Sequence, residues 1–281
     1  MRITDLDLEP IYTLPCLQVC PGGKDYRRKD VPVLSAAVDT LPDGLDALLV
    51  TSDLQFIDTD TAPVDERRLF GEVVARELGT MADLGLLPDP SRTGVLLAGD
   101  LYAHRALTSR GGIGDVSVVW RAFDDAFAWV AGVAGNHDDF LGQTSRPRSM
   151  TLGSPRLLDG DVATFDGLTV GGVCGVIGEN SKPWRRAEAD VVGAITDVLD
   201  ASPDVLILHE SPQPPSKTHR GRGKPSLTRA ILDHASGDHP PLVISGHVGW
   251  ADPLDGVEGG PQFLNVEERV VLLTRERLGV I

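Results

Sequence analysis

The sequence predicts a protein of the α/β class, because short apolar runs typical of buried strands alternate along the chain with stretches of helical periodicity. The apolar runs are continuous, which indicates strands that are covered on both faces. Several of these runs end in a carboxylate, an amide or an imidazole, as in α/β proteins that bind ligands at the edge of a sheet. In residues 64–87 the apolar side chains recur at helical spacing: Leu69, Val73, Val74, Leu78, Met81 and Leu84.

The first 45 residues come before the first clear motif and have a mixed pattern. Residues 11–18 are a candidate strand. The basic run Arg27-Arg28-Lys29 is interpreted as solvated surface, with a phosphate-steering role as the alternative. We therefore treat residues 1–45 as an N-terminal extension that adds an edge strand, a lid or a subunit contact.

The next part of the chain predicts three buried strands with a helix between each pair. A polar residue follows each strand, and a tight glycine turn precedes the polar residues after the third. The strands are expected at residues 45–53, 94–100 and 127–131, and the helices at residues 64–87 and near residues 116–126.

The second half of the chain continues the alternation. A strand pair joined by an Asp166-Gly167 turn comes first, and two helices then alternate with two strands that end in histidines. The last two strands are expected to form a closing hairpin. Strands are expected at residues 162–165, 168–176, 204–210, 241–247, 262–265 and 269–274, and helices at residues 187–199 and 226–234. Because no repeat or linker interrupts this series, we expect a single domain over residues 1–281.

The composition is that of a globular protein with a full core, since 41% of the residues are hydrophobic and 24% are charged. The formal net charge of −15 argues against binding to extended nucleic acid or a membrane surface, because phosphate groups would be repelled. The N-terminus lacks a signal-peptide pattern, and no stretch is apolar enough for a membrane span. The three cysteines form no CxxC pair, so we expect reduced thiols in a cytoplasmic protein.

Five of the predicted strands place a metal-binding side chain at or just after the carboxyl end. Taken singly, a strand-end Asp is most often a turn or helix cap, and a single His is most often a satisfied core residue. Together they bring several charges to one region, and a cation would offset the cost of burying them. Mixed carboxylate and imidazole donors favour Mn, Fe, Zn or Co over calcium. The five residues are Asp53, Asp100, Asn136, His209 and His247.

These residues lie in a series of short motifs. Along the chain the motifs are Asp53-Leu54-Gln55, Gly99-Asp100, Gly135-Asn136-His137-Asp138, His209, and Gly246-His247-Val248-Gly249. Over residues 45–275 the series resembles the calcineurin-like metallophosphoesterases, whose pattern is Asp-x-His, Gly-Asp, Gly-Asn-His-Asp/Glu, a lone His and Gly-His-x-His. The resemblance implies a four-layer αββα sandwich, in which two mixed β-sheets lie face to face and helices flank them.

The resemblance also implies how metal is held. Asp100 corresponds to the carboxylate that two cations share, and Asn136, His209 and His247 complete the second cation position. Asp53 belongs to the first position. We therefore expect one or two divalent metal ions, chosen from Mn, Fe, Zn or Mg, with Mn favoured.

Two residues of the first position depart from the family pattern. Gln55 stands where the family has His, and Gly249 stands where the family has its last His. The side-chain oxygen of Gln55 is the expected donor, and a harder oxygen donor favours Mn or Mg over Zn. His104 is a candidate to compensate, with a surface position as the alternative.

The activity that the resemblance implies is metal-dependent hydrolysis of a small phosphomonoester or phosphodiester by a metal-bound hydroxide, with a nucleotide among the candidate substrates. His137 corresponds to a non-ligand histidine that protonates the leaving oxygen or stabilises the charge of the phosphorane. Asp138 is expected to orient that imidazole from behind, with a helix cap as the alternative. Arg220 and Arg222, in the basic loop 217–224, are candidate substrate-binding residues, because a guanidinium matches phosphate geometry; a solvated loop is the alternative.

The departures at Gln55 and Gly249 motivate an alternative function. The chain would then be a degenerate family member that binds metal or nucleotide with little or no turnover. A non-metal α/β scaffold protein is a third interpretation. The expected partner is a small phosphoester or nucleotide substrate, without a membrane or an extended nucleic acid.

Overall fold

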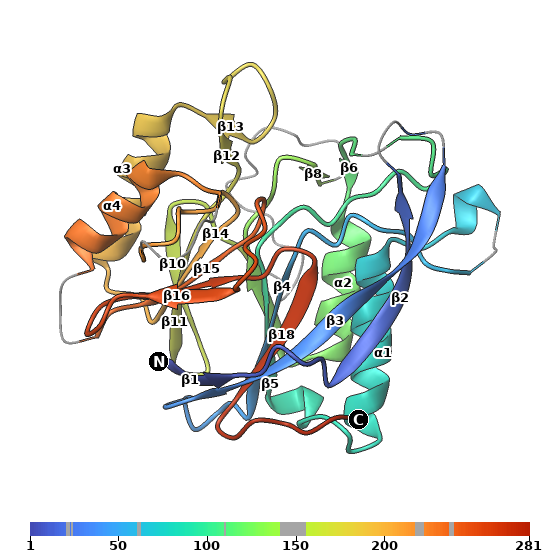
Figure 1. Cartoon of the computed structure of the whole chain (residues 1–281), viewed down its shortest axis with the longest axis horizontal. Helices are drawn as coiled ribbons and strands as arrows, with labels where there is room; N and C mark the ends of the chain where they lie inside the picture. Colours follow the sequence, from blue (N-terminus) through green and yellow to red (C-terminus); the bar gives the residue numbers. More distant parts are fainter. Residues whose placement is uncertain are drawn as a thin grey trace.

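The computed structural model describes residues 1–20, 23, 25–60, 63–109, 111–140, 156–216, 222–235 and 239–281. In this part of the chain two mixed β-sheets lie face to face, and a pair of α-helices covers the outer face of each sheet (Figure 1). The predicted four-layer αββα sandwich is therefore confirmed.

The first sheet is built largely from the N-terminal half of the chain. Its strands lie in the order β1-β3-β18-β4-β5-β7-β9, and β2 pairs with β3. Strands β4, β5 and β7 are parallel, so their carboxyl ends lie at one edge. The elements are β1 (Ile3–Leu6), β2 (Tyr12–Val19), β3 (Tyr26–Val38), β4 (Ala47–Ser52), β5 (Thr93–Leu97), β7 (Trp129–Gly132), β9 (Arg156–Leu157) and β18 (Arg269–Thr274), with helices α1 (Phe70–Asp83) and α2 (Ser117–Ala126).

The second sheet has the strand order β10-β11-β14-β15-β17-β16. Both faces of β14 are buried: Val205 and Ile207 belong to the core between the sheets, and Leu206 and Leu208 to the core under the helices. The elements are β10 (Asp161–Phe165), β11 (Leu168–Val173), β14 (Val205–Leu208), β15 (Leu242–Ser245), β16 (Leu254–Gly256) and β17 (Gln262–Asn265), with helices α3 (Glu188–Asp200) and α4 (Pro225–His234). Two short pairs, β6 (Gly114–Asp115) with β8 (Asp138–Asp139) and β12 (Val176–Ile177) with β13 (Arg185–Arg186), complete the strands.

Helix α1 begins later than the apolar periodicity predicts. The segment Val64–Glu66 is a separate 3₁₀ turn, and the α-helix starts at Phe70. The start is fixed by Glu72, whose Oε1 accepts a hydrogen bond from the backbone N–H of Leu69 at 2.8 Å. This contact satisfies one of the N–H groups that a helix start leaves without a partner.

The closing hairpin predicted for the last two strands is wrong. Strand β17 pairs with β15 and β16 in the second sheet, whereas β18 lies between β3 and β4 in the first sheet. Both strands are buried along most of their length, and a two-stranded hairpin on the surface could not cover them. Residues 266–268 therefore cross from one sheet to the other.

The N-terminal extension contributes strands to the first sheet, which is closest to the edge-strand interpretation. Strand β3 pairs in parallel with β18, and β1 and β2 lie on its other side. Arg27 and Arg28 are exposed, as expected. Lys29 is half-buried and forms an ion pair with Glu268.

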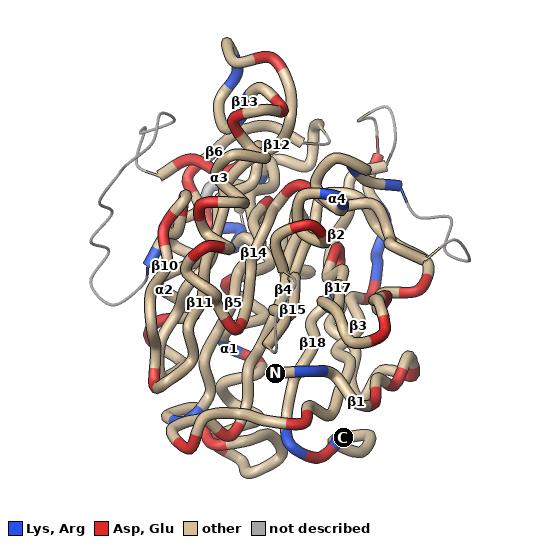
Figure 2. Tube along the Cα trace, turned by 90° about the vertical axis from the view of Figure 1, so that its left-hand side faces the viewer, with Lys and Arg blue, Asp and Glu red and all other residues tan. Residues whose placement is uncertain are grey.

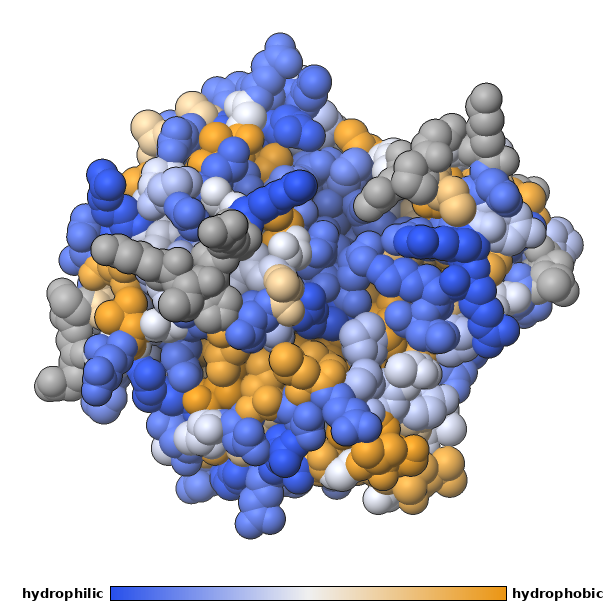
Figure 3. All heavy atoms as spheres, in the orientation of Figure 1, coloured by the Kyte–Doolittle hydropathy of each residue, from blue (hydrophilic) through white to orange (hydrophobic). Residues whose placement is uncertain are grey.

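Asp and Glu residues are spread along loops and helices of both halves of the molecule (Figure 2). The face drawn in Figure 3 is hydrophilic over most of its area, with apolar atoms gathered below its centre. Among the described residues, none of the helices combines the length and the apolar character that crossing a bilayer requires. Cys16, Cys20 and Cys174 are free thiols.

Candidate metal centre

The candidate metal ligands follow the carboxyl ends of strands in both sheets. Asp53 follows β4 and Asp100 follows β5 in the first sheet, and His209 and His247 follow β14 and β15 in the second. Asp53, Asp100 and His247 have φ angles of 56°, 56° and 64°, in the left-handed region that side chains disfavour. Such backbone strain is common at binding sites, where the surrounding fold holds it in place.

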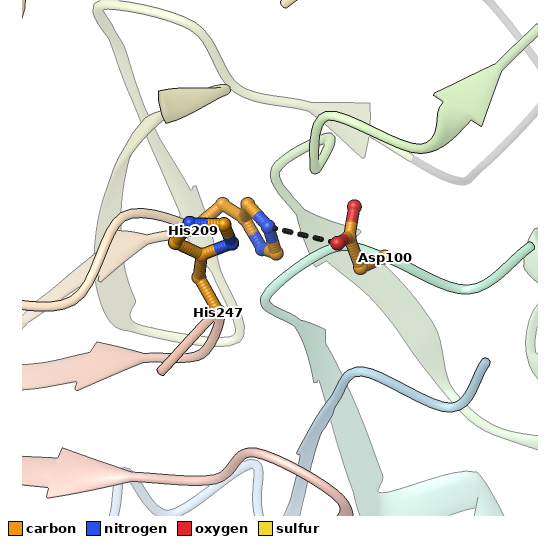
Figure 4. Close-up of side chains that lie close together, drawn as sticks. All are labelled: Asp100, His209 and His247. Atoms are coloured by element: carbon orange, nitrogen blue, oxygen red, sulfur yellow. Dashed lines mark ion pairs between the residues drawn. The ribbon is translucent and has the colours of Figure 1, made fainter. Parts of the chain in front are cut away.

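The two sheets bring three of these side chains together. One ligand atom each of Asp100, His209 and His247 lies within 4.8 Å of the others. Nε2 of His209 lies 3.3 Å from Oδ2 of Asp100, and the ring centres of His209 and His247 are 5.1 Å apart. Figure 4 shows the two rings side by side, with Asp100 facing His209 from the other sheet.

The orientation of His209 is that of a metal ligand. Its ring is fully buried, and its Nδ1–H donates to the carbonyl oxygen of Ala98 at 2.8 Å, so Nε2 is the nitrogen that can bind a cation in place of a proton. Within the described residues, this Nε2 and Oδ1 of Asn136 make no hydrogen bond, although both atoms are buried. An orphaned buried acceptor costs about 1–3 kcal/mol. Both atoms are of kinds that divalent cations bind, so the donor set fits such an ion.

The first cation position lies beside this cluster. Oδ2 of Asp53 accepts hydrogen bonds from Oγ of Ser52 at 2.6 Å and from the backbone N–H of His247 at 2.8 Å. Nε2 of Gln55 donates to Oδ2 of Asp100 at 3.1 Å, so the amide nitrogen, and not the oxygen expected as a ligand, faces the carboxylate. The assignment of Gln55 as a ligand stays a prediction.

Burial and mutual charge shift the protonation of these groups. Burial raises the pKa of Asp53 to about 8, and the nearby Asp100 carboxylate acts in the same direction. Burial opposes protonation of His209, but Asp100 outweighs it and raises the pKa to about 10. The pKa of Asp100 is lowered despite its burial, mainly by His209. Burial, together with the His209 charge, lowers the pKa of His247 to about 4, so His247 is a neutral imidazole at neutral pH, the form that binds metals.

His137 and Asp138 have different partners from those expected. Nδ1 of His137 lies 2.6 Å from the carbonyl oxygen of Gly112, and its Nε2 lies 4.0 Å from Oδ2 of Asp100. The fully buried carboxylate of Asp138 instead accepts backbone N–H donors from Asp100, Leu101 and Gly135, each at 2.8 Å. The Gly112 carbonyl oxygen therefore orients His137. The prediction that Asp138 orients His137 is wrong, because backbone amides occupy both carboxylate oxygens of Asp138.

The glycines of the motifs are required by close approach. A Cβ on Gly135 would lie 2.0 Å from Oδ1 of Asp100, and a Cβ on Gly246 would lie 2.4 Å from Oδ2 of Asp53. Both distances are far below van der Waals contact, so a side chain at either position would displace a candidate ligand.

A pocket of about 270 Å³ opens at this cluster. The sequence did not single out two of its acidic residues, Glu267 and Glu268, which lie on the crossing between β17 and β18. The signal in the sequence is an acidic pair between two buried strands. A larger cavity, of about 590 Å³, lies elsewhere, beside α3, and holds none of the candidate ligands. The smaller pocket is lined by Asp53, Gln55, Asp100, Gly111, His137, His247, Glu267 and Glu268.

The remaining predicted residues lie outside the pocket or outside the described residues. Arg220 falls in the second group. Arg222 is exposed, and its carbonyl oxygen accepts a hydrogen bond from Nε1 of Trp250 at 3.1 Å. Both arginines stay predictions as substrate-binding residues. His104 is exposed near Thr108, so its surface interpretation holds.

Comparisons with known proteins identify a family whose pattern this chain matches. A family model described as calcineurin-like phosphoesterase matches residues 47–251. Among solved structures, the chain is similar to the TT1561 protein of Thermus thermophilus, with 16% sequence identity and a TM-score of 0.47 over 82% of this chain and 88% of that chain. It is also similar to the Thermus thermophilus sulfate thiohydrolase SoxB in complex with glycerol, with 13% identity and a TM-score of 0.43 over 81% of this chain and 53% of that one. No curated protein matches in sequence.

Proposed function

This chain belongs to the calcineurin-like phosphoesterase family, and on that premise we propose that it hydrolyses a small phosphomonoester or phosphodiester, with nucleotides among the candidate substrates. The observation that carries the proposal is the meeting of Asp100, His209 and His247 between the two sheets. The orphaned buried atoms of His209 and Asn136 support it, because they are donors of the kind that a divalent cation takes up.

The cofactor in this proposal is one or two divalent ions, with Mn favoured. Asp100, Asn136, His209 and His247 would hold one ion, and Asp53 with Asp100 would hold the other. When bound, such an ion lowers the pKa of water from about 15.7 toward 7 and offsets the charge of a phosphoryl group. Manganese suits this mixture of carboxylate, amide and imidazole donors.

The side chains of the pocket explain why the ions are needed for substrate binding. Asp53, Asp100, Glu267 and Glu268 surround the space that a phosphate would enter. The ionised carboxylates among them repel an anionic ester unless cations intervene. His137 lies on the same wall with its Nε2 away from the Gly112 contact, where it can protonate a leaving oxygen.

The test is hydrolysis of p-nitrophenyl phosphate and bis(p-nitrophenyl) phosphate with and without manganese. Mutation of a residue that hydrogen-bonds to a metal ligand typically lowers metal affinity or activity about 10–100-fold. Loss of a ligand itself, in Asn136→Ala or His247→Ala, should therefore lower kcat/KM about 100-fold or more. His104→Ala is the matched control, because His104 is exposed and outside the pocket. Equal hydrolysis by the wild type and both ligand variants would exclude the proposal.

A second candidate function is metal or nucleotide binding with little turnover. It is favoured by Gln55, whose amide nitrogen donates a hydrogen bond to one carboxylate oxygen of Asp100, and by Gly249, which has no side chain to bind a metal. The same experiment separates the two functions. A wild-type protein that binds manganese and leaves both esters intact would support the binding role.

A further inference from the structure

The space beside Gly249 is already filled by a carboxylate. A Cβ placed on Gly249 would lie 1.8 Å from Oε2 of Glu267 and 3.0 Å from the carboxyl carbon of Glu267. Gly249 is the position at which the family pattern has its last histidine. The carboxylate of Glu267 therefore reaches the region that the missing imidazole would start from.

The backbone explains how Glu267 comes to this place. It lies on the crossing between β17 and β18 and forms a parallel bridge with Ser52, the residue before Asp53. The next N–H, that of Glu268, donates to the carbonyl oxygen of Ser52 at 3.2 Å. Glu267 is thus fixed beside the first cation position, and it lines the same pocket as Asp53 and Asp100.

Glu268, its neighbour, is engaged elsewhere. Its carboxylate forms an ion pair with Lys29 and accepts a hydrogen bond from Nε2 of Gln18 at 3.2 Å. Both partners come from the N-terminal strands β2 and β3. Glu268 therefore has cationic and amide partners of its own, which makes it a matched control with the same charge on the same pocket.

We infer that Glu267 replaces the missing histidine as a ligand of the first cation. This inference rests on the proposed metal dependence. It is supported by a second observation at Asp100, the carboxylate that both positions share: Oδ2 of Asp100 lies 3.3 Å from the fully buried Nε2 of His209, which makes no hydrogen bond among the described residues. With Glu267 in place of an imidazole, the charged donors of the first position are all carboxylates: those of Asp53, Asp100 and Glu267. Such a site selects hard cations, Mn²⁺ or Mg²⁺, over Zn²⁺.

A purely structural role for Glu267 is the competing interpretation. The guanidinium Nε of Arg269 donates to the carbonyl oxygen of Glu267 at 3.1 Å. Burial lowers the pKa of Arg269, and the Glu267 charge partly opposes that shift. In that case Glu267 would balance a buried cation, and its removal would change stability without changing metal stoichiometry.

The test is direct measurement of manganese binding to the full chain, by electron paramagnetic resonance of free Mn²⁺ and by calorimetry. We expect two ions per chain in the wild type. Glu267→Gln should weaken one ion about tenfold or more and leave the other unchanged. Glu268→Gln should bind both ions as the wild type does. Thermal unfolding without metal is recorded for each variant to show that it is folded.

A rescue experiment separates ligation from charge balance. Glu267→Ala removes the carboxylate that fills the space beside Gly249, and Gly249→His in that background supplies an imidazole instead. The double variant should again bind an ion at the first position, and that position should now prefer Zn²⁺, because imidazole is the softer donor. One ion in the wild type, or equal weakening in Glu267→Gln and Glu268→Gln, would overturn the assignment.

The outcomes also separate this inference from the proposed function. Two ions that depend on Glu267, without hydrolysis of either ester, would leave the inference standing and remove the proposed function. Manganese-dependent hydrolysis with a single bound ion, whose affinity does not change in Glu267→Gln, would support the proposed function and remove the inference.

Discussion

The imidazole of His137 has one nitrogen fixed by the protein and the other on the pocket side. Nδ1 lies 2.6 Å from the Gly112 carbonyl oxygen, so it carries the proton of that hydrogen bond, and Nε2 lies 4.0 Å from Oδ2 of Asp100. If His137 protonates the leaving oxygen, His137→Ala should lower kcat/KM for an alkyl phosphate about 10²–10⁴-fold. The loss should be smaller for a p-nitrophenyl ester, whose leaving group departs as a stable anion. Rates over a series of leaving groups measure this.

Manganese stoichiometry serves as the control for this variant, because His137 is not among the proposed ligands. It should equal that of the wild type. The same loss of rate for good and poor leaving groups, or a lost ion, would show that His137 does not act as the acid.

The candidate ligands stand out in the sequence because each one follows a buried strand. Asp100 and His209 are examples, since a continuous apolar run indicates the strand and the parallel arrangement puts its end at the ligand edge. Glu267 could not be predicted in this way. Its position depends on the chain leaving one sheet after β17 and entering the other at β18, and on the missing side chain at Gly249.

Two loops of the first sheet are held together by one carboxylate. Asp138 accepts the N–H groups of Asp100 and Leu101, which follow β5, and of Gly135, which follows β7. Asp138→Ala would leave three buried donors without a partner. Because each costs about 1–3 kcal/mol, the free energy of unfolding should fall by about 3 kcal/mol or more in guanidinium denaturation. Manganese affinity should fall as well, since the loop that carries Asp100 loses its fixed position.

The neighbouring Asp139 provides the control for this clamp. It is half-buried, and its Oδ1 accepts the N–H of Phe140 at 2.7 Å, a local contact within one turn. Asp139→Ala should therefore change the unfolding free energy by much less. Identical denaturation midpoints for Asp138→Ala and Asp139→Ala would show that the three hydrogen bonds do not stabilise the loops.

At the scale of elements, the sequence predicted strand and helix positions better than strand partners. The run 269–274 is correctly a strand, because its apolar residues are continuous. Its partner was predicted as the preceding strand, but β18 lies between β3 and β4, and β3 belongs to the N-terminal extension. Pairing of distant segments depends on the packing of the whole core, which local periodicity does not encode.

Both sheets share one hydrophobic core. The cluster between them joins residues of β5, such as Val95, to residues of β14, such as Ile207, and the chain crosses between the sheets at residues 266–268. Because neither sheet can bury its inner face without the other, we propose that residues 1–281 are a single domain that unfolds in one transition.

The proposed metal centre should stabilise this whole unit, because its candidate ligands come from both sheets. Asp100 belongs to the first sheet, and His209 and His247 belong to the second, so a bound cation links the two halves in the folded state alone. At a free Mn²⁺ concentration about 100 times Kd the gain in unfolding free energy is about 2.7 kcal/mol, which raises the thermal midpoint. Circular dichroism should follow the backbone, while tryptophan fluorescence reports on all four tryptophans, which include Trp129 in the first sheet and Trp250 in the core of the second.

The two signals should coincide with and without manganese, and both midpoints should rise together. His247→Ala should lose most of the rise, while His104→Ala, which alters an exposed histidine, should keep it. Two separate transitions would mean that the sheets unfold independently. If manganese raised the thermal midpoint of His247→Ala as much as that of the wild type, the stabilising ion would lie outside this centre. A cation that does not contact His247 would not link the carboxyl ends of β5 and β15 through that side chain.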